Sequence, residues 1–404
     1  MRVAGKRPRK SGWRAVGRQA EVFGLGNFTN GSTDVVNANN CGKMMKSIYF
    51  LLRNLVPASL LALCTYSVCI AKDAPLSMTQ LRALKVPVSV TYVRDLGRGD
   101  GYAAYLVSYY SAGLKIHAMV AQPTTAAPAS GFPVLVVNHG FHPTPQRYGM
   151  TDDGVDARPG DYYRRIPSLY AKAGFLVLMP DYRGHNISEG LEYTKGLLAS
   201  GYYTQDVLAL LNGIHEIKHA DSKNVFMWGH SLGGEVTLRT LLASGLVKGA
   251  SLWSSVGGDI WDQAYYYSRY TNLVADDSNL VPKKAMQALR AQIEELGQGA
   301  EDTRSREPLE YLCDLQAPLI IHHALDDVGA DYRWSMRLAK ELSVRNKRYQ
   351  FHTYAGSNHL FKDVEMQLAA DRDIDFFRAI IRNLSTQTAV LSPAPKSAGA
   401  GICP

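Results

Sequence analysis

A serine between glycines is the residue of this chain whose surroundings best suit covalent chemistry. The segment Gly229-His230-Ser231-Leu232-Gly233-Gly234 follows an apolar run at 225–228 and precedes a helical pattern of apolar residues. A buried strand, a sharp turn and a helix in this order expose a serine hydroxyl at the turn, and the glycines let strand and helix approach closely. We therefore interpret Ser231 as a nucleophile. The alternative is a glycine-rich turn without chemistry.

A serine hydroxyl is a weak nucleophile unless a base takes its proton, and the base needs a carboxylate to fix its tautomer. His359 lies in the loop 356–359, directly after the last predicted strand, and is the candidate base. The acid should follow the preceding strand, where Asp326 stands. We predict Asp326 as the acid, with Asp327 as its close rival and Asp331 as a distant one.

Acyl transfer also needs N–H donors for the oxyanion that forms in the transition state. We predict the backbone N–H of Leu232, directly after the serine, and that of Phe141, in the loop after the first buried parallel strand. His139 and His142 in the same loop have no partner at zinc-ligand spacing. We therefore expect neither a metal nor another cofactor.

The elements that must position these groups alternate along the chain. Two runs at 105–110 and 114–121 read as an antiparallel lead-in, together with a strand predicted at 86–91 and a loop at 97–101. Parallel strands are predicted at 134–137, 175–179, 225–228, 250–253, 319–321 and 349–353, with helical spacing between them. This alternation predicts an α/β fold with a mostly parallel, doubly wound sheet.

The alternation stops between residues 257 and 312, which predicts a helical cap insertion over the carboxyl edge of the sheet, where ligands bind in open α/β sheets. Its aromatic residues Trp261, Tyr265 and Tyr266 are candidates to line a substrate pocket. The alternative, that they only pack the cap onto the domain, stays open.

The N-terminal part of the sequence predicts export. Residues 1–43 are basic and lack periodicity, which favours an over-extended or disordered leader, and residues 44–71 have the basic start, apolar run and small terminal residue of a signal peptide. A membrane anchor is the alternative. We expect a secreted or periplasmic domain over 72–390, a flexible tail over 391–404 and no stable membrane insertion after cleavage. Cys313 and Cys403 could pair in an oxidising compartment.

The net charge of +8 lies largely in the basic leader, so it does not indicate a nucleic-acid partner. The part that would remain after cleavage is near neutral. A small peptide or ester is the expected partner.

Several blocks together resemble the catalytic domain of the prolyl oligopeptidase family, a branch of the α/β-hydrolase superfamily. They are 132–141, Asp181-Tyr182-Arg183-Gly184-His185, Asp206, 229–234 and the loops of Asp326 and His359. The resemblance covers roughly residues 130–385 and implies a Ser231, Asp326 and His359 triad with an oxyanion site at Phe141 and Leu232. The stretch before residue 130 is too short for the β-propeller of classical members. The implied activity is that of a propeller-less serine peptidase, or alternatively of a carboxylesterase or dienelactone-hydrolase-like esterase.

Overall fold

The computed structural model describes residues 74–389, apart from 85, 86, 143, 149–162, 164, 195, 271–286, 288, 289, 292, 293, 295–299 and 357. The predicted leader, signal peptide and tail lie outside these residues and stay predictions. Cys313 is a disulfide cysteine, whereas Cys403 lies outside the described residues, so their pairing also stays a prediction. Within the described part of the chain, no helix is long and apolar enough to cross a membrane.

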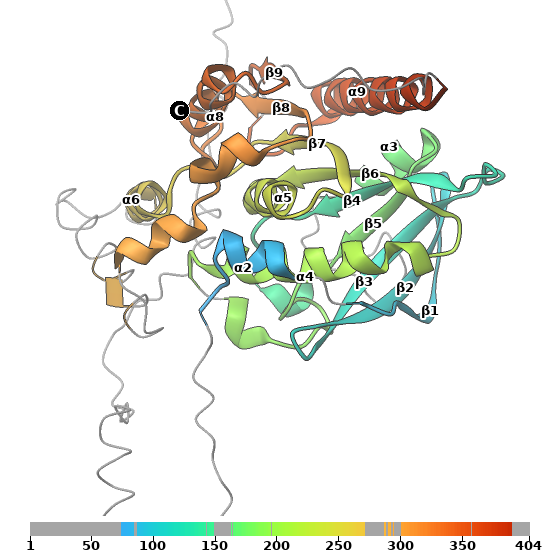
Figure 1. Cartoon of the computed structure of the whole chain (residues 1–404), viewed down its shortest axis with the longest axis horizontal. Helices are drawn as coiled ribbons and strands as arrows, with labels where there is room; N and C mark the ends of the chain where they lie inside the picture. The colour runs from blue at the N-terminus through green and yellow to red at the C-terminus, as the bar shows by residue number, and fades with distance from the viewer. Residues whose placement is uncertain are drawn as a thin grey trace, which may run out of the picture. The chain divides into compact units, whose positions relative to one another are not determined.

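A nine-stranded sheet forms the centre of the fold, in the order β1-β2-β3-β5-β4-β6-β7-β8-β9 (Figure 1). β1 pairs antiparallel with β2, β2 with β3 and β3 with β5, and all pairs from β5 to β9 are parallel. The mostly parallel sheet and its antiparallel lead-in are thereby confirmed. The strands are β1 Thr91–Gly99, β2 Tyr102–Ser111, β3 Leu114–Pro123, β4 Phe132–Asn138, β5 Leu176–Pro180, β6 Ala220–His230, β7 Val247–Trp253, β8 Leu319–Ala324 and β9 Tyr349–Tyr354.

The helices lie on both faces of this sheet, which explains why its central strands contain near-continuous apolar runs, such as 134–137 in β4 and 225–228 in β6. They are α2 Met78–Ala83, α3 Ile166–Lys172, α4 Ala199–Gly213, α5 Leu232–Ala243, α6 Ile260–Tyr270, α8 Tyr332–Val344 and α9 Asp363–Ala389. Short 3-10 turns occur at Pro145–Arg147, Leu191–Thr194, Ile214–Glu216, Ala300–Arg306 and Pro308–Asp314.

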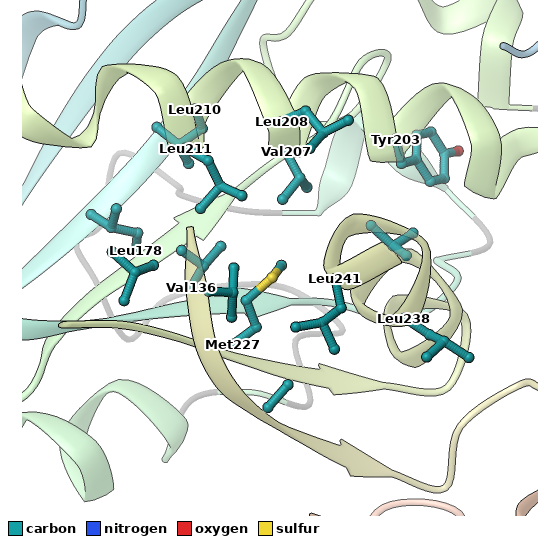
Figure 2. Packing of buried hydrophobic residues seen from close by; sticks show 14 of the residues in the cluster. Val136, Leu178, Tyr203, Val207, Leu208, Leu210, Leu211, Met227, Leu238 and Leu241 are labelled. Carbon is teal, nitrogen blue, oxygen red and sulfur yellow. The ribbon is translucent and has the colours of Figure 1, made fainter. Parts of the chain in front are cut away.

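Alternate residues of one strand enter different cores. On β4, Val134 and Val136 join the core formed with α2, α4, α5 and α8, whereas Leu135 and Val137 join the core formed with α3 and α9. Figure 2 shows the first of these cores, where Val207 and Leu211 of α4 point toward the strands. The period of two along a strand therefore places both of its faces in contact with helices.

The first predicted strand is wrong. Residues 87–90 have no regular structure, and β1 begins at Thr91 and continues through Gly97 and Gly99, where a loop is predicted from the sequence. β1 is an exposed edge strand with register shifts, so its side chains show little alternation of apolar and polar residues. Glycine at position 99 leaves room for the ring of Tyr102, since a Cβ there would overlap that ring.

The parallel topology brings five loops to one edge of the sheet. β4, β6, β7, β8 and β9 all end at the same side, and the loops that follow them contain Gly140, Ser231, Val256, Asp327 and His359. Residues more than 200 positions apart in the sequence therefore meet at this carboxyl edge. The insertion expected over this edge contributes α6 and the turns at Ala300–Arg306 and Pro308–Asp314 among the described residues.

Candidate active site

Ser231 lies in the sharp turn that its sequence predicts. It separates β6 from α5 and has φ 56° and ψ −125°, a conformation that non-glycine residues rarely adopt. Three backbone hydrogen bonds hold the turn: the Ser231 N–H donates to Trp253 O at 3.0 Å, and its carbonyl accepts from the N–H of Gly234 at 2.9 Å and Val256 at 3.0 Å. Strain of this kind persists only where the surroundings enforce it.

The glycines around Ser231 are sites of close backbone approach. A Cβ on Gly229 would overlap the carbonyl oxygen of Gly233, and a Cβ on Gly233 would overlap the carbonyl oxygen of Asn138 at the end of β4. On Gly140, in the loop after β4, a Cβ would lie 3.0 Å from the Cβ of Ser231. The loop predicted to contribute the oxyanion donor is therefore packed directly against the serine.

We predict that Gly233→Ala destabilises the fold by about 1–3 kcal/mol or more, because its methyl group would overlap a backbone atom rather than a flexible side chain. Gly245→Ala is the matched control, since a Cβ there meets open space, and surface changes of this kind stay within about 0.5 kcal/mol. Urea denaturation of both variants measures the difference. Equal midpoints would contradict the close packing of β4 against α5.

The carboxylate that contacts His359 belongs to Asp327, so the prediction of Asp326 is wrong. Both carboxylate oxygens of Asp327 lie 2.9 Å from His359 Nδ1. Asp326 is exposed and accepts a hydrogen bond from the Asn358 N–H at 3.1 Å. Adjacent residues of the loop after β8 point in different directions, and only the second of the two points toward the imidazole.

Asp331, the third candidate, has a different task. Its side chain caps the N-terminus of α8 by accepting from the Arg333 N–H at 2.9 Å, and it forms an ion pair with the Arg333 guanidinium. Aspartate is a preferred residue at this position of a helix.

Asp327 is held in place from several directions. Its Oδ1 accepts from the N–H groups of Gly329 at 2.7 Å and Ala330 at 3.0 Å, and His323 Nε2 lies 3.3 Å from Oδ2. Its side chain has no exposed surface. Burial alone would raise the pKa of this carboxyl, but hydrogen bonds from His323 and His359 outweigh burial and hold the pKa well below its ordinary value. Asp327 is therefore ionised at neutral pH.

An ionised carboxylate at Nδ1 determines the tautomer of His359. The carboxylate only accepts, so Nδ1 carries a proton and donates it to Asp327, which leaves Nε2 of the neutral ring as an acceptor. The ring is partly exposed. The backbone of Gly329 packs closely against it, since a Cβ on Gly329 would lie only 2.6 Å from His359 Cγ. A histidine oriented in this way can serve as a general base.

His230 connects the loops of Ser231 and His359. Its Nε2 lies 2.9 Å from the carbonyl oxygen of His359, and the two imidazole rings are 4.5 Å apart. The serine and the candidate base therefore belong to loops in direct contact.

The two predicted oxyanion donors lie beside the serine in the chain or in space. Leu232 is the first residue of α5, where a backbone N–H has no acceptor within the helix. Phe141 follows Gly140, whose backbone packs against Ser231. Their roles as donors stay a prediction.

The aromatic residues of α6 divide between two surroundings. The hydroxyl of Tyr266 donates to Val328 O at 3.0 Å and that of Tyr267 to Gly329 O at 3.3 Å, so both contact the loop of Asp327. Trp261 packs with Leu198 and Ala264 on another side of the helix. Tyr265 is 49% exposed. Of the three predicted pocket residues, Tyr266 is thus the one placed against the candidate site.

His139, considered above as a metal ligand, is buried between two aromatic rings. Its ring stacks on Tyr148 at 3.8 Å and on Tyr182 at 4.2 Å. Across the described ranges, no three His, Cys, Asp or Glu side chains are grouped so that they could hold a metal ion.

The sheet topology and the strained serine turn define the class of this protein: an α/β-hydrolase fold with its serine at the carboxyl edge of the sheet. The family model of the prolyl oligopeptidase family matches residues 162–383, more than half of the chain. The chain therefore belongs to the prolyl oligopeptidase family and is a serine hydrolase.

The chain is similar to an uncharacterized peptidase, YtmA, of Bacillus subtilis, with 23% identity over 65% of this chain and 88% of the relative. It is also similar to the acylamino-acid-releasing enzyme of Rattus norvegicus, with 21% identity over 63% of this chain and 32% of the relative. The chain thus spans about a third of the length of that enzyme.

Two solved structures have the same fold. Acetyl xylan esterase 1 from Thermoanaerobacterium has a TM-score of 0.53 and 12% identity, covering 76% of this chain and 95% of the esterase. A puromycin hydrolase has a TM-score of 0.53 and 16% identity, covering 72% of this chain and 39% of the hydrolase.

Proposed function

We propose that the protein cleaves a peptide or ester bond through an acyl-enzyme, with Ser231 as nucleophile, His359 as general base and Asp327 as the carboxylate that orients it. Ser231 Oγ attacks the carbonyl carbon while its proton moves to His359 Nε2. The same proton then passes to the leaving amine or alcohol, and water releases the acyl group by the reverse sequence. Asp327 stabilises the imidazolium and stays ionised throughout.

The observation that carries this proposal is the pairing of His359 Nδ1 with the buried Asp327 at 2.9 Å, in loops that adjoin a strained serine turn. A catalytic histidine needs one fixed tautomer, and a buried carboxylate supplies it. The backbone of Leu232 and Phe141 would then stabilise the oxyanion.

The second candidate is an esterase without peptidase activity. Among the described residues before β4, the elements are α2 and the strands β1 to β3, and these strands extend the same sheet. That part of the chain forms no separate domain over the carboxyl edge. The described residues between α2 and β4 therefore place no separate domain between Ser231 and an ester with a small acyl group.

A fluorophosphonate probe tests the proposal because it reacts with activated serines. We expect stoichiometric labelling of the folded protein, with the mass increase on the peptide that contains Ser231. Failure of the folded protein to label would contradict a serine nucleophile. Turnover of p-nitrophenyl acyl esters compared with aminoacyl and prolyl p-nitroanilides then separates the two candidates, since a peptidase cleaves both kinds of bond and an esterase only the esters.

A further inference from the structure

Two buried side chains outside the proposed triad connect the loops that surround Ser231. His230 comes directly before the serine, and Tyr163 comes shortly before α3. Both side chains are almost completely buried. The Tyr163 hydroxyl lies 2.6 Å from His230 Nδ1 and accepts from the Gly140 N–H at 2.9 Å. On its other side, His230 Nε2 lies 2.9 Å from the carbonyl oxygen of His359.

The backbone carbonyl of His359, which can only accept, determines where the protons of this hydrogen-bond network lie. A backbone carbonyl only accepts, so His230 Nε2 carries a proton and donates it to His359 O. The neutral ring then accepts at Nδ1, and the Tyr163 O–H donates to it. Burial, and next the proximity of His359, lower the pKa of His230 to about 3, so the ring stays neutral over the working range of pH.

Every donor in this hydrogen-bond network therefore has an acceptor. The network connects the loop after β4 with the loop of His359. It starts at Gly140, whose backbone packs against Ser231 and precedes Phe141, and it ends at the backbone of the candidate base. In between it passes through the residue next to the nucleophile. Fully satisfied buried networks of this kind fix geometry, because leaving one member unpaired is costly.

We propose that Tyr163 and His230 are positioning residues. They hold the loop of Gly140 and Phe141 and the loop 356–359 in fixed places around Ser231. This inference rests on the function proposed above. Neither side chain needs to touch the substrate. They act through backbone groups, so their loss should weaken stabilisation of the transition state and leave binding of the substrate nearly unchanged.

Tyr163→Phe tests the proposal, because it removes one hydroxyl and keeps the buried ring. With p-nitrophenyl acetate as substrate, we expect kcat to fall about ten- to hundredfold and KM to change less than about threefold. Affinity for trifluoroacetophenone should fall by the same factor as kcat/KM. This ketone adds reversibly to the serine and places an oxyanion in the site, so it reports transition-state binding.

Tyr170→Phe is the matched control. Its hydroxyl is equally buried and donates to Asp373 of α9 at 2.6 Å. Asp373 also accepts from Trp253 Nε1 at the end of β7 and lies 2.9 Å from His322 Nε2 in β8, so this second network is close to the site but contacts neither Gly140 nor the backbone of His359. We expect this variant to lose stability without loss of kcat. At position 230, His230→Gln keeps one donor and one acceptor, whereas His230→Leu keeps neither, so the glutamine variant should retain clearly more activity than the leucine variant.

An unchanged kcat in Tyr163→Phe would overturn the inference, as would equal kinetic losses in Tyr163→Phe and Tyr170→Phe, which indicate general loss of structure. A fall in kcat/KM without a matching fall in ketone affinity would overturn it as well. Failure of the proposed function has a different signature: the wild-type protein would then show no turnover that depends on Ser231, and both proposals would fall together.

Discussion

Replacing Ser231 with alanine should lower ester turnover by at least about a thousandfold, and His359→Ala should do the same. The serine supplies the atom that forms the acyl-enzyme, and the histidine takes its proton, so either loss disables the whole unit. For the same reason the double variant should be little worse than either single variant. Residual activity would come from substrate binding and the oxyanion donors alone.

Two controls distinguish this loss from general damage. Ser222→Ala changes an exposed serine in the same strand, β6, and His352→Ala changes a histidine in β9, the strand that leads to His359. Both should keep kcat within about twofold, because Ser222 is exposed and the half-buried His352 stacks on His322 and does not contact His359 or Asp327 in the described structure. Wild-type turnover in Ser231→Ala or in His359→Ala would refute the assignment of that residue.

Asp327→Asn should lower kcat about ten-thousandfold near neutral pH, whereas Asp326→Asn should cost little. An amide group in place of the carboxylate would donate toward Nδ1 of His359, which favours the tautomer that carries its proton on Nε2. That ring cannot take a proton from the serine. Asp326 only accepts from a backbone N–H on the exposed side of the loop.

Asp326→Asn and Asp327→Asn are matched variants, because each replaces one carboxylate oxygen with an amide nitrogen at adjacent positions of the same loop. Circular dichroism and thermal unfolding should show an intact fold in both. Steady-state kinetics on p-nitrophenyl acetate then gives the two losses. A large loss in Asp326→Asn together with a small one in Asp327→Asn would move the acid by one position, and small losses in both would exclude this loop as its source.

Local sequence determined much of this fold. The predicted central strands all occur, because strands buried on both faces contain near-continuous apolar runs that the sequence shows directly. The serine turn was equally visible, since Gly229 and Gly233 stand where a side chain would overlap backbone atoms. His359 could be placed in the loop after the last strand from its position in the chain alone. The edge strand β1 was missed because almost all of its residues are exposed, which leaves little apolar pattern to detect.

Tertiary structure alone decided which groups meet. The sequence places Asp326 and Asp327 in the same loop, but only the folded loop, with two backbone N–H groups and His323 around one carboxylate, directs Asp327 toward the imidazole. Nothing in the sequence singles out Tyr163, which reaches His230 across 67 positions. Such contacts depend on the direction of individual side chains and on loops joined by the sheet. Composition and periodicity report burial and secondary structure, and they carry no information about those directions.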